Sequence, residues 1–419
     1  MKILMCNTYY YLRGGSERCL FDLSELLVSH GHEVIPFSMV DDQNRPSPYS
    51  DYFVSHIDYP SRLSQESSMG DKLNALGRVV YSREAAGQIK RLIQDTRPDI
   101  AHIHGIAHEI SPSILPEIKR AGLPIVQTLH DYKLLCPNTT FLSHGEICEK
   151  CKYRRYYQVV LNRCKRDSLP ASLLAGVEMY AHKISAIYEN NVDRFIAPSE
   201  FLNEKLAEYR IHVPTVNIPN FLYLDRYEPC YEPEDYFLYI GRLAVNKGIK
   251  TLLQAMQQVN RSHLYIAGRG ELKEELKAFV EDNDLHNVKF LGHLTSDELI
   301  SQLRKARFTV VPSEWYENYS MAVIESLACG TPVIGANIGG IPEQVVDGFN
   351  GFLFEPGKAA QLAEKINYLL DNPQRTVELG RNGRRRVEEL NGPEKHYQQT
   401  LAVYESVLNK TAYVTADNA

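Results

Sequence analysis

Residues 236–270 read YFLYIGRLAVNKGIKTLLQAMQQVNRSHLYIAGRG, and this stretch contains the repeating unit that decides the fold. The apolar run 236–240 predicts a buried parallel strand, and the apolar spacing of residues 248–258 predicts a helix after it. A second apolar run, 263–267, predicts the next strand, which a Gly-Arg-Gly sequence ends. Strand, helix and strand in this order form the βαβ unit of a parallel sheet.

The alternation continues after residue 270 with the same short apolar runs. Ligands of such sheets bind beyond the carboxyl ends of the strands, so we expect functional side chains in the loops that follow strands. The further predicted strands are 288–291, 308–311 and 332–335. One further predicted helix begins at residue 271, and two others span 296–303 and 320–328.

The first half of the chain contains a second α/β series. Residues 2–6 predict a strand, Gly14-Gly15 interrupts the apolar pattern, and residues 17–30 have the apolar spacing of a helix. Residues 41–71 are rich in Ser, Pro, Tyr and Asp without a clear period, which predicts an irregular connection. The further predicted strands are 33–39, 99–104, 124–129 and 193–197.

A polar, proline-containing break between residues 212 and 234 separates the two series. Because 419 residues exceed one ordinary domain, we predict an α/β protein whose two Rossmann-like, doubly wound domains face a central cleft. The predicted limits are 1–216 for the N-terminal domain, 217–400 for the C-terminal domain, and 401–419 for a C-terminal helix and tail.

Composition is typical of a globular protein, with 44% hydrophobic and 23% charged residues. The apolar start of the chain ends at Asn7, too early for a signal peptide, and no later apolar run has the roughly 18 residues of a membrane span. We therefore expect a cytoplasmic protein, with the inner face of the membrane as an alternative location. The formal charge of −6 argues against a dedicated nucleic-acid binder.

Two glycine-containing loops follow predicted strands and lead into predicted helices. Arg242 and Lys247 bring two cations to a helix N-terminus, where free backbone N–H groups already attract anions such as a diphosphate. Gly14-Gly15 would let backbone amides approach a ligand in the same way. Solvated loop charges explain the first loop equally well, and a tight turn explains the second loop better when it is taken alone.

Residues 312–325, PSEWYENYSMAVIE, run from a predicted strand into a predicted helix and carry Glu317 and Glu325. Negative charge at a helix entrance can simply complement the helix dipole, which explains Glu317 alone better than it explains the pair. Eight helical steps span roughly 12 Å, beyond the ~5 to 9.5 Å between the two carboxyl groups of glycosidases. We therefore expect different roles for the two carboxylates.

Taken together, the loop residues resemble the retaining glycosyltransferases of family four, which have the GT-B fold. The resemblance extends over nearly the whole chain, and the motifs fall on predicted loops. They are Gly14-Gly15, His130-Asp131, Pro219-Asn220, Gly241-Arg242-Leu243 with Lys247-Gly248, the pair Glu317 and Glu325, and Gly339-Gly340-Ile341-Pro342-Glu343.

The resemblance implies that a sugar moves, with retention at its anomeric carbon, from a UDP- or GDP-linked donor to a glycan or lipid-linked acceptor in polysaccharide or glycoconjugate biosynthesis. It implies that Arg242 and Lys247 grip the donor diphosphate without an obligatory catalytic metal. Glu317 would lie against the transferred sugar, and His130 would reach that sugar from the other domain. Glu325 would hold the donor ribose.

The resemblance also implies further contacts with the donor. Gly14 and Gly15 would line the phosphate and acceptor side, and the base would lie near His293 and Leu294. The backbone amides of Asn318-Tyr319-Ser320 would contact the donor as well. These three residues depart from the smaller, Gly-containing sequence of many family members, so the donor sugar stays open.

Four of the eight cysteines, Cys136, Cys148, Cys151 and Cys164, fall within one short stretch. Four thiolates at this spacing suit a structural Zn²⁺ ion, which would leave no open position for catalysis. Free thiols are the alternative. The ion would fix an insertion near residues 136–166.

The cysteine-containing segment is also basic and contains tyrosines between its cations. Such a segment suits anionic lipid headgroups or a lipid-diphosphate acceptor, and an ordinary solvated face is the alternative, with nucleic acid a remote third reading. The basic residues are Lys150, Lys152, Arg154, Arg155, Arg163, Lys165 and Arg166.

Two other functions share this architecture, a sugar-nucleotide epimerase and a non-catalytic sugar-nucleotide-binding subunit. The pair of Glu317 and Glu325 favours transfer over epimerisation. The presence of both Glu317 and His130 argues against an inactive subunit.

Overall fold

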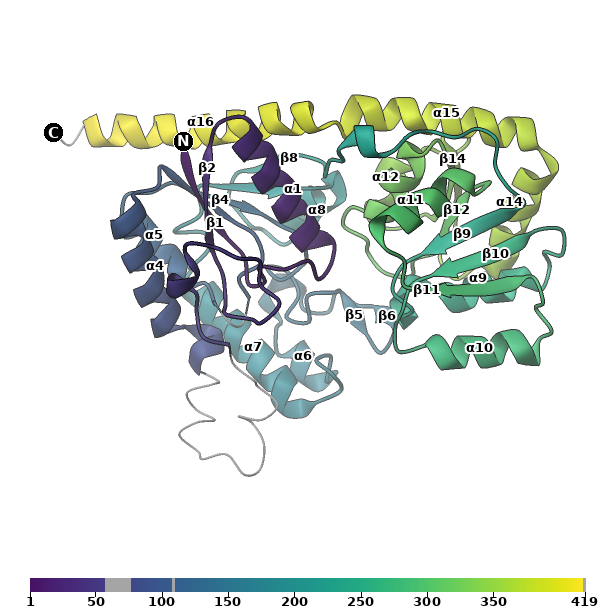
Figure 1. Cartoon of the computed structure of the whole chain (residues 1–419). Helices are drawn as coiled ribbons and strands as arrows, with labels where there is room; N and C mark the ends of the chain where they lie inside the picture. Colours follow the sequence, from purple (N-terminus) through teal and green to yellow (C-terminus); the bar gives the residue numbers. More distant parts are fainter. Residues whose placement is uncertain (57–76, 108–109, 417–419) are drawn as a thin grey trace.

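The computed structural model describes residues 1–56, 77–107 and 110–416, and its main feature is two parallel sheets flanked by helices (Figure 1). The first sheet has the strand order β2-β1-β3-β4-β7-β8, and the second has the order β11-β10-β9-β12-β13-β14. All neighbouring strands in both sheets pair in parallel. The predicted α/β class with two Rossmann-like halves is confirmed.

The strands of the first sheet are short and mostly buried, as expected where helices cover a parallel sheet. Their apolar runs explain why the sequence predicted them, except for β8, which is too short to give a clear period. The strands are β1 (Lys2–Cys6), β2 (Glu33–Phe37), β3 (Ile100–Ile103), β4 (Ile125–Thr128), β7 (Arg194–Ala197) and β8 (Thr215–Asn217).

Several helices of the first half begin at a serine whose side chain accepts a backbone N–H of the first turn, which stabilises the helix start. These N-caps are Ser82, Ser168 and Ser199. The helices are α1 (Gly15–Ser29), η1 (Ser50–Tyr52), α4 (Arg83–Thr96), α5 (Ile114–Arg120), η2 (Lys152–Arg154), α6 (Gln158–Leu161), α7 (Leu169–Ile184) and α8 (Glu200–Glu208).

Two irregular regions of the first half depart from the plain α/β alternation. The antiparallel hairpin of β5 (Leu142–Ser143) and β6 (Glu146–Ile147) extends toward the second half (Figure 1). Residues 57–76, which fall largely in the predicted irregular connection 41–71, lie outside the described residues.

In the second sheet the strand order changes direction between β9 and β12, which are neighbours although two strands separate them in sequence. The loops after β9 and β12 therefore diverge, and ligands of open α/β sheets bind at such a point. The strands are β9 (Tyr236–Ile240), β10 (His263–Ala267), β11 (Val288–Gly292), β12 (Thr309–Val311), β13 (Val333–Ala336) and β14 (Gly351–Phe354).

The helices of the second half include those that the sequence predicted at 248–258, 296–303 and 320–328. α11 begins with a capping box formed by Thr295 and Glu298, which satisfies two backbone donors of its first turn. The helices are η3 (Leu224–Arg226), η4 (Val245–Lys247), α9 (Ile249–Met256), α10 (Lys273–Asp282), α11 (Ser296–Lys305), α12 (Met321–Ala328), α13 (Ile341–Gln344), α14 (Ala359–Asp371) and α15 (Pro373–Leu390).

The last helix, α16 (Pro393–Ala416), returns to the first half (Figure 1). Its Tyr397 and Tyr404 belong to the same buried apolar cluster as Ile3 and Met5 of β1. The chain thus crosses between the halves twice. The two crossing segments are hydrogen-bonded to each other, because Asn391 Nδ2 donates to the carbonyl of Asn220 at 2.7 Å. The domain limits at 216/217 and 400/401 stay predictions.

Candidate active site

The divergent loops after β9 and β12 bring Lys247 and Glu317 together. Lys247 Nζ lies 2.6 Å from Glu317 Oε1. The same oxygen accepts hydrogen bonds from Ser313 Oγ at 2.7 Å and Trp315 Nε1 at 2.8 Å. Burial opposes ionisation of Glu317, but the Lys247 charge and these hydrogen bonds outweigh it, so its pKa is lowered from the ordinary value. Glu317 is therefore a fixed carboxylate at neutral pH.

Glycines allow these loops to pack closely. Gly248 has a φ of +65°, and a Cβ there would lie 1.8 Å from the carbonyl oxygen of Pro312. Gly339 has a φ of +60°, and a Cβ there would lie 2.4 Å from the carbonyl oxygen of Glu317. Only glycine suits such positions. The predicted glycine loops therefore hold the backbone around Lys247 and Glu317 in place.

The other donor-site residues predicted in the second half also lie at the carboxyl ends of strands. Arg242 is exposed directly after β9, and its carbonyl accepts a hydrogen bond from Tyr239 Oη at 2.9 Å. His293 is exposed and Leu294 is half-buried directly after β11. One edge of the sheet thus presents cations, an imidazole and the Glu317 loop.

Glu325 lies in α12 and is buried, with 4% of its surface exposed. Arg18 of α1 forms an ion pair with Glu325 Oε1, and Tyr227 Oη donates to the same oxygen at 3.2 Å. Arg18 Nη2 also donates to Tyr227 Oη at 2.6 Å. Arg18 was not among the residues predicted from the sequence, although its place just after Gly14-Gly15 could have suggested a role in the site.

Gly14 and Gly15 lie where the two halves meet. Gly14 is the N-cap residue of α1 and has no side chain that could cap the helix. A Cβ on Gly15 would lie 3.7 Å from Met321 Cγ in the first turn of α12. The N-terminus of α1 therefore lies beside the helix that carries Glu325.

All three residues of the segment Asn318-Tyr319-Ser320 are hydrogen-bonded, and Asn318 contacts the first half. Asn318 Oδ1 accepts a hydrogen bond from Ser199 Oγ at 2.8 Å, and its Nδ2 donates to the carbonyl of Leu129 at 2.9 Å. Tyr319 Oη accepts from Asn391 Nδ2 at 2.8 Å. The Ser320 backbone amide donates to Gln344 at 2.9 Å. The larger side chain at 318 thus serves a contact between the halves, and the one at 319 holds the chain where it leaves α15.

His130 follows β4 and has a partner, His104, that was not predicted from the sequence. Its Nε2 lies 2.7 Å from Nδ1 of His104, and the two rings stack with centroids 5.0 Å apart. Burial lowers the pKa of His130 to about 4. The imidazole is therefore neutral near pH 7 and acts as a hydrogen-bonding group rather than as a cation.

A cavity of about 20 Å³ lies behind His130. His104 Nε2 is buried there without a hydrogen-bond partner among the described residues. The volume suits a water molecule but is far too small for a sugar nucleotide. The lining residues are Cys19, Leu23, His104, Thr128, His130, Ile196, Ile218, Asn220, Phe221 and His396.

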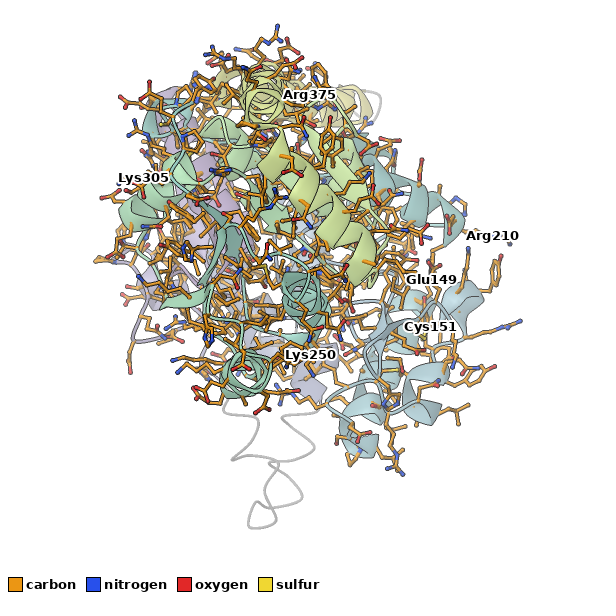
Figure 2. All side chains as sticks on the ribbon, turned by 90° about the vertical axis from the view of Figure 1, so that its right-hand side faces the viewer. Glu149, Cys151, Arg210, Lys250, Lys305 and Arg375 are labelled. Carbon is orange, nitrogen blue, oxygen red and sulfur yellow. The ribbon has the colours of Figure 1, made fainter. Side chains whose placement is uncertain are left out.

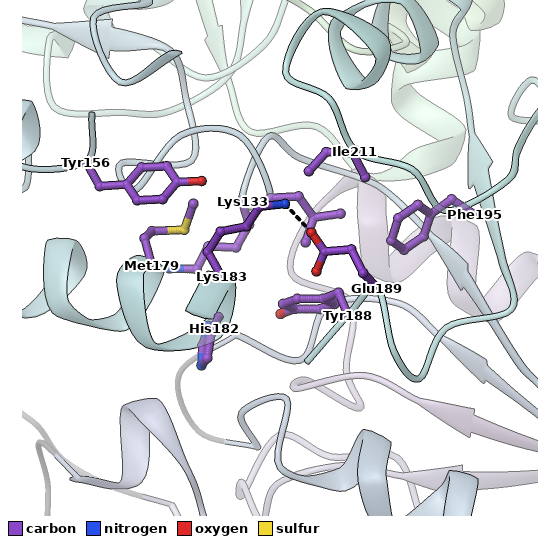
Figure 3. A pocket seen from close by; sticks show the side chains of 10 residues that line it. Lys133, Tyr156, Met179, His182, Lys183, Tyr188, Glu189, Phe195 and Ile211 are labelled. Carbon is purple, nitrogen blue, oxygen red and sulfur yellow. Dashed lines mark hydrogen bonds and ion pairs between the residues drawn. The ribbon is translucent and has the colours of Figure 1, made fainter. Parts of the chain in front are cut away.

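A second cavity of about 20 Å³ lies beneath α7 and is equally too small for the donor (Figure 3). Figure 3 shows Lys183 paired with Glu189 at its wall. Lys133, in the loop after β4, pairs with buried Glu178 at 2.6 Å. These charges fix α7 to the first sheet.

Tyr316, next to Glu317, extends into the first half. Its ring packs on Phe201 at a centroid distance of 4.9 Å, and its Oη donates to Glu149 Oε1 at 2.9 Å. Lys205 Nζ lies 2.9 Å from the same carboxylate oxygen. Glu149 lies close to Cys151 (Figure 2). The cysteine segment is therefore in direct contact with the Glu317 loop.

The four clustered cysteines are free thiols in the structure. Burial and the neighbouring Cys136, Cys164 and Cys148 thiols raise the pKa of Cys151 to about 12, so the four lie in one neighbourhood. Within residues 1–56, 77–107 and 110–416, however, no three Cys, His, Asp or Glu side chains converge closely enough to hold a metal ion. The donor set suits zinc, but the side-chain positions do not form its ligand sphere, and the zinc ion stays a prediction.

Family models match both halves of the chain. The model described as Glycosyltransferase Family 4 matches residues 13–226, just over half of the chain, and the model described as Glycosyl transferases group 1 matches residues 225–386. Glycogen synthase from Mycobacterium tuberculosis is 26% identical over 92% of this chain and 90% of its own.

Solved structures share the whole architecture. Sucrose-phosphate synthase from Thermosynechococcus elongatus has a TM-score of 0.72 at 23% identity, over 98% of this chain and 99% of its own. HepE from Anabaena, in complex with UDP-glucose, has a TM-score of 0.66 at 18% identity, over 97% of this chain and 100% of its own. With the fold and the family models in agreement, this chain is a glycosyltransferase of the GT-B fold and belongs to Glycosyltransferase Family 4.

Proposed function

We propose that the enzyme transfers a sugar from a nucleoside-diphosphate donor to a glycan or lipid-linked acceptor, with retention at the anomeric carbon. The observation that carries this proposal is the pair of Lys247 and Glu317 at the divergence of the loops after β9 and β12. The pair places a cation and a carboxylate side by side, where an open α/β sheet binds its ligand.

The cations would act on the leaving group. When the bond between the anomeric carbon and the phosphate oxygen breaks, negative charge grows on the β-phosphate. Lys247 and exposed Arg242 lie at the sheet edge where this charge would develop, so they would stabilise the transition state more than the ground state. We propose that they do so without an obligatory metal, and activity should then persist in EDTA.

The carboxylate and His130 would act on the sugar. Glu317 Oε1 is engaged by Lys247, Ser313 and Trp315, which weakens it as a nucleophile. We therefore favour attack of the acceptor hydroxyl on the face that the phosphate leaves, with the hydroxyl proton passing to the departing β-phosphate oxygen. Neutral His130 and ionised Glu317 would then hydrogen-bond to sugar hydroxyl groups.

A UDP-sugar is the first donor to test, because HepE has been solved in complex with UDP-glucose. We expect incubation with UDP- and GDP-sugars and glycan or lipid-diphosphate acceptors to release the nucleoside diphosphate and to add one sugar mass to the acceptor. NMR of the fresh product should show the donor's anomeric configuration. Inversion would refute retention, while an epimerised donor, or binding without turnover, would identify the epimerase or the inactive subunit instead.

We also propose that Cys136, Cys148, Cys151 and Cys164 hold one structural Zn²⁺ ion, supported by their shared neighbourhood and thiol chemistry. Protein purified without a metal-binding tag should contain about one equivalent of zinc by elemental analysis. Cys148→Ser should lose the zinc with only local destabilisation, because each sheet has its own core. Cys329→Ser, outside the cluster, is the control. Metal-free, fully active protein with four reactive thiols would disprove the site.

A further inference from the structure

Helix α7 buries two titratable side chains on its inner face and exposes several apolar side chains on its outer face. On the inner face, Glu178 and His182 are only 1% and 6% exposed. Lys133 pairs with Glu178, and His182 Nε2 lies 3.0 Å from the carbonyl oxygen of Val80. Lys133 and His182 both line the cavity beneath α7 (Figure 3). Buried hydrogen bonds and ion pairs, rather than apolar burial alone, thus fix the orientation of the helix.

The outer face of α7 carries a continuous apolar stripe. Leu169, Leu173 and Val177 recur at every fourth position and are 51%, 54% and 51% exposed, and Ile184 at the end of the helix is 84% exposed. Residues at this spacing share one face of a helix. Single exposed apolar residues are ordinary, but a row along a whole helix is typical of a surface that contacts something apolar.

Four exposed arginines precede this stripe in the chain. Arg163 and Arg166 are exposed in the turn between α6 and α7, beside Leu161, which is 71% exposed. Arg154 and Arg155 are exposed in and after η2. The predicted basic segment therefore keeps four exposed arginines. Its Lys152 pairs with Glu208, and its Lys165 is half-buried.

We propose that the outer face of α7, with the arginines before it, docks on an anionic lipid surface. Apolar side chains would enter the boundary between headgroups and acyl chains, and guanidinium groups would pair with lipid phosphates. A second copy of the chain is the poorer partner. In a symmetric dimer the same patch faces itself, so the arginines of the two copies would repel one another.

The position of α7 suits such docking. α6 and α7 lie at the lower edge of the first half in Figure 1, apart from the second sheet, and the loops after β9 and β12 belong to that second sheet. Docking through α7 would therefore leave the donor loops uncovered. No helix in the described ranges is long and apolar enough to cross a membrane, so the contact would be one of surface docking through α7.

Vesicle flotation tests the proposal without donor or acceptor, so it is independent of the proposed transfer reaction. The full chain should float with vesicles of phosphatidylcholine and phosphatidylglycerol, but not with phosphatidylcholine alone, and high salt should weaken the binding. Leu173→Asp with Val177→Asp should lower vesicle affinity by at least about tenfold. Arg163→Gln with Arg166→Gln should lower it by about fivefold for each arginine.

Matched control variants test whether vesicle binding depends on this surface or on exposed apolar residues and cations anywhere on the protein. Val28→Asp replaces a valine of α1 that is 55% exposed, and Arg261→Gln with Lys277→Gln removes two exposed cations of the second half. Both controls should bind vesicles as the unmodified chain does. Absence of vesicle binding, or equal loss in surface and control variants, would overturn the proposal. A dimer that Leu173→Asp dissociates, together with no vesicle binding, would assign the surface to a second copy.

Discussion

Lys247→Met is expected to lower kcat by about 10²–10³-fold, the loss seen when one preorganised group is removed from a developing negative charge. The variant removes the cation 2.6 Å from Glu317 while the Ser313 and Trp315 hydrogen bonds to that carboxylate remain. The effect should fall on kcat more than on KM, because the phosphate charge is greatest in the transition state. Steady-state kinetics with the donor found in the panel provides the measurement.

Three further variants test whether the loss of activity is specific to the cations of this loop. Lys250→Met removes an exposed cation three residues later, one that pairs with Glu275 at the surface, and it should leave kcat unchanged. Lys247→Arg keeps the charge and should recover part of the activity. Arg242→Ala should also lower kcat, since it removes the second cation of the loop. Near-normal turnover in both Lys247→Met and Arg242→Ala would contradict the diphosphate assignment.

Glu325→Ala is expected to raise the donor KM by about 10–100-fold with little change in kcat, in line with the loss of a hydrogen bond to a charged group. A ribose contact persists from the ground state to the transition state, so its loss weakens binding without slowing the chemical step. Donor titration by calorimetry, combined with kinetics, measures the two effects separately. A loss confined to kcat would contradict the ribose role.

The ion pair between Arg18 and Glu325 allows a second test of the role of Glu325 in donor binding. Arg18→Ala leaves the buried Glu325 carboxylate without its cation, which would disturb the position of that carboxylate. We expect weaker donor binding in this variant as well, although Arg18 belongs to the other half of the molecule. Glu274→Ala, on the exposed face of α10, is the matched control and should bind the donor normally.

The sequence predicted the two sheets because each central strand is a short buried apolar run, as in Tyr236–Ile240 and Ile100–Ile103. It also predicted that Arg242, Lys247 and Glu317 follow strand ends, because loop position depends only on the local order of strand and helix. The structure then places Lys247 beside Glu317. That contact depends on the strand order, which brings β12 next to β9.

The site residues that were not predicted from the sequence make contacts with residues far away in the chain, and no local sequence pattern indicates such contacts. Arg18 meets Glu325 across the two halves, and Tyr316 reaches Glu149 in the cysteine segment. His104 was missed because the sequence around it predicted only the end of a buried strand. Its ring contacts His130, which follows β4, the strand next to β3. β14 and the hairpin of β5 and β6 were missed because they are short and lack a clear period.

The return of α16 to the first half affects how the enzyme is made. Tyr404 of α16 packs in the cluster that contains Ile3 and Met5, and its Oη lies 2.6 Å from Nδ1 of buried His102. A domain synthesised first generally folds first while the ribosome is still translating. Here α16 covers an apolar face of the first sheet and the imidazole of His102. Both stay uncovered until the second sheet has been translated and α16 has left the exit tunnel. The half that is synthesised first can therefore complete this buried cluster only after the second half has been translated.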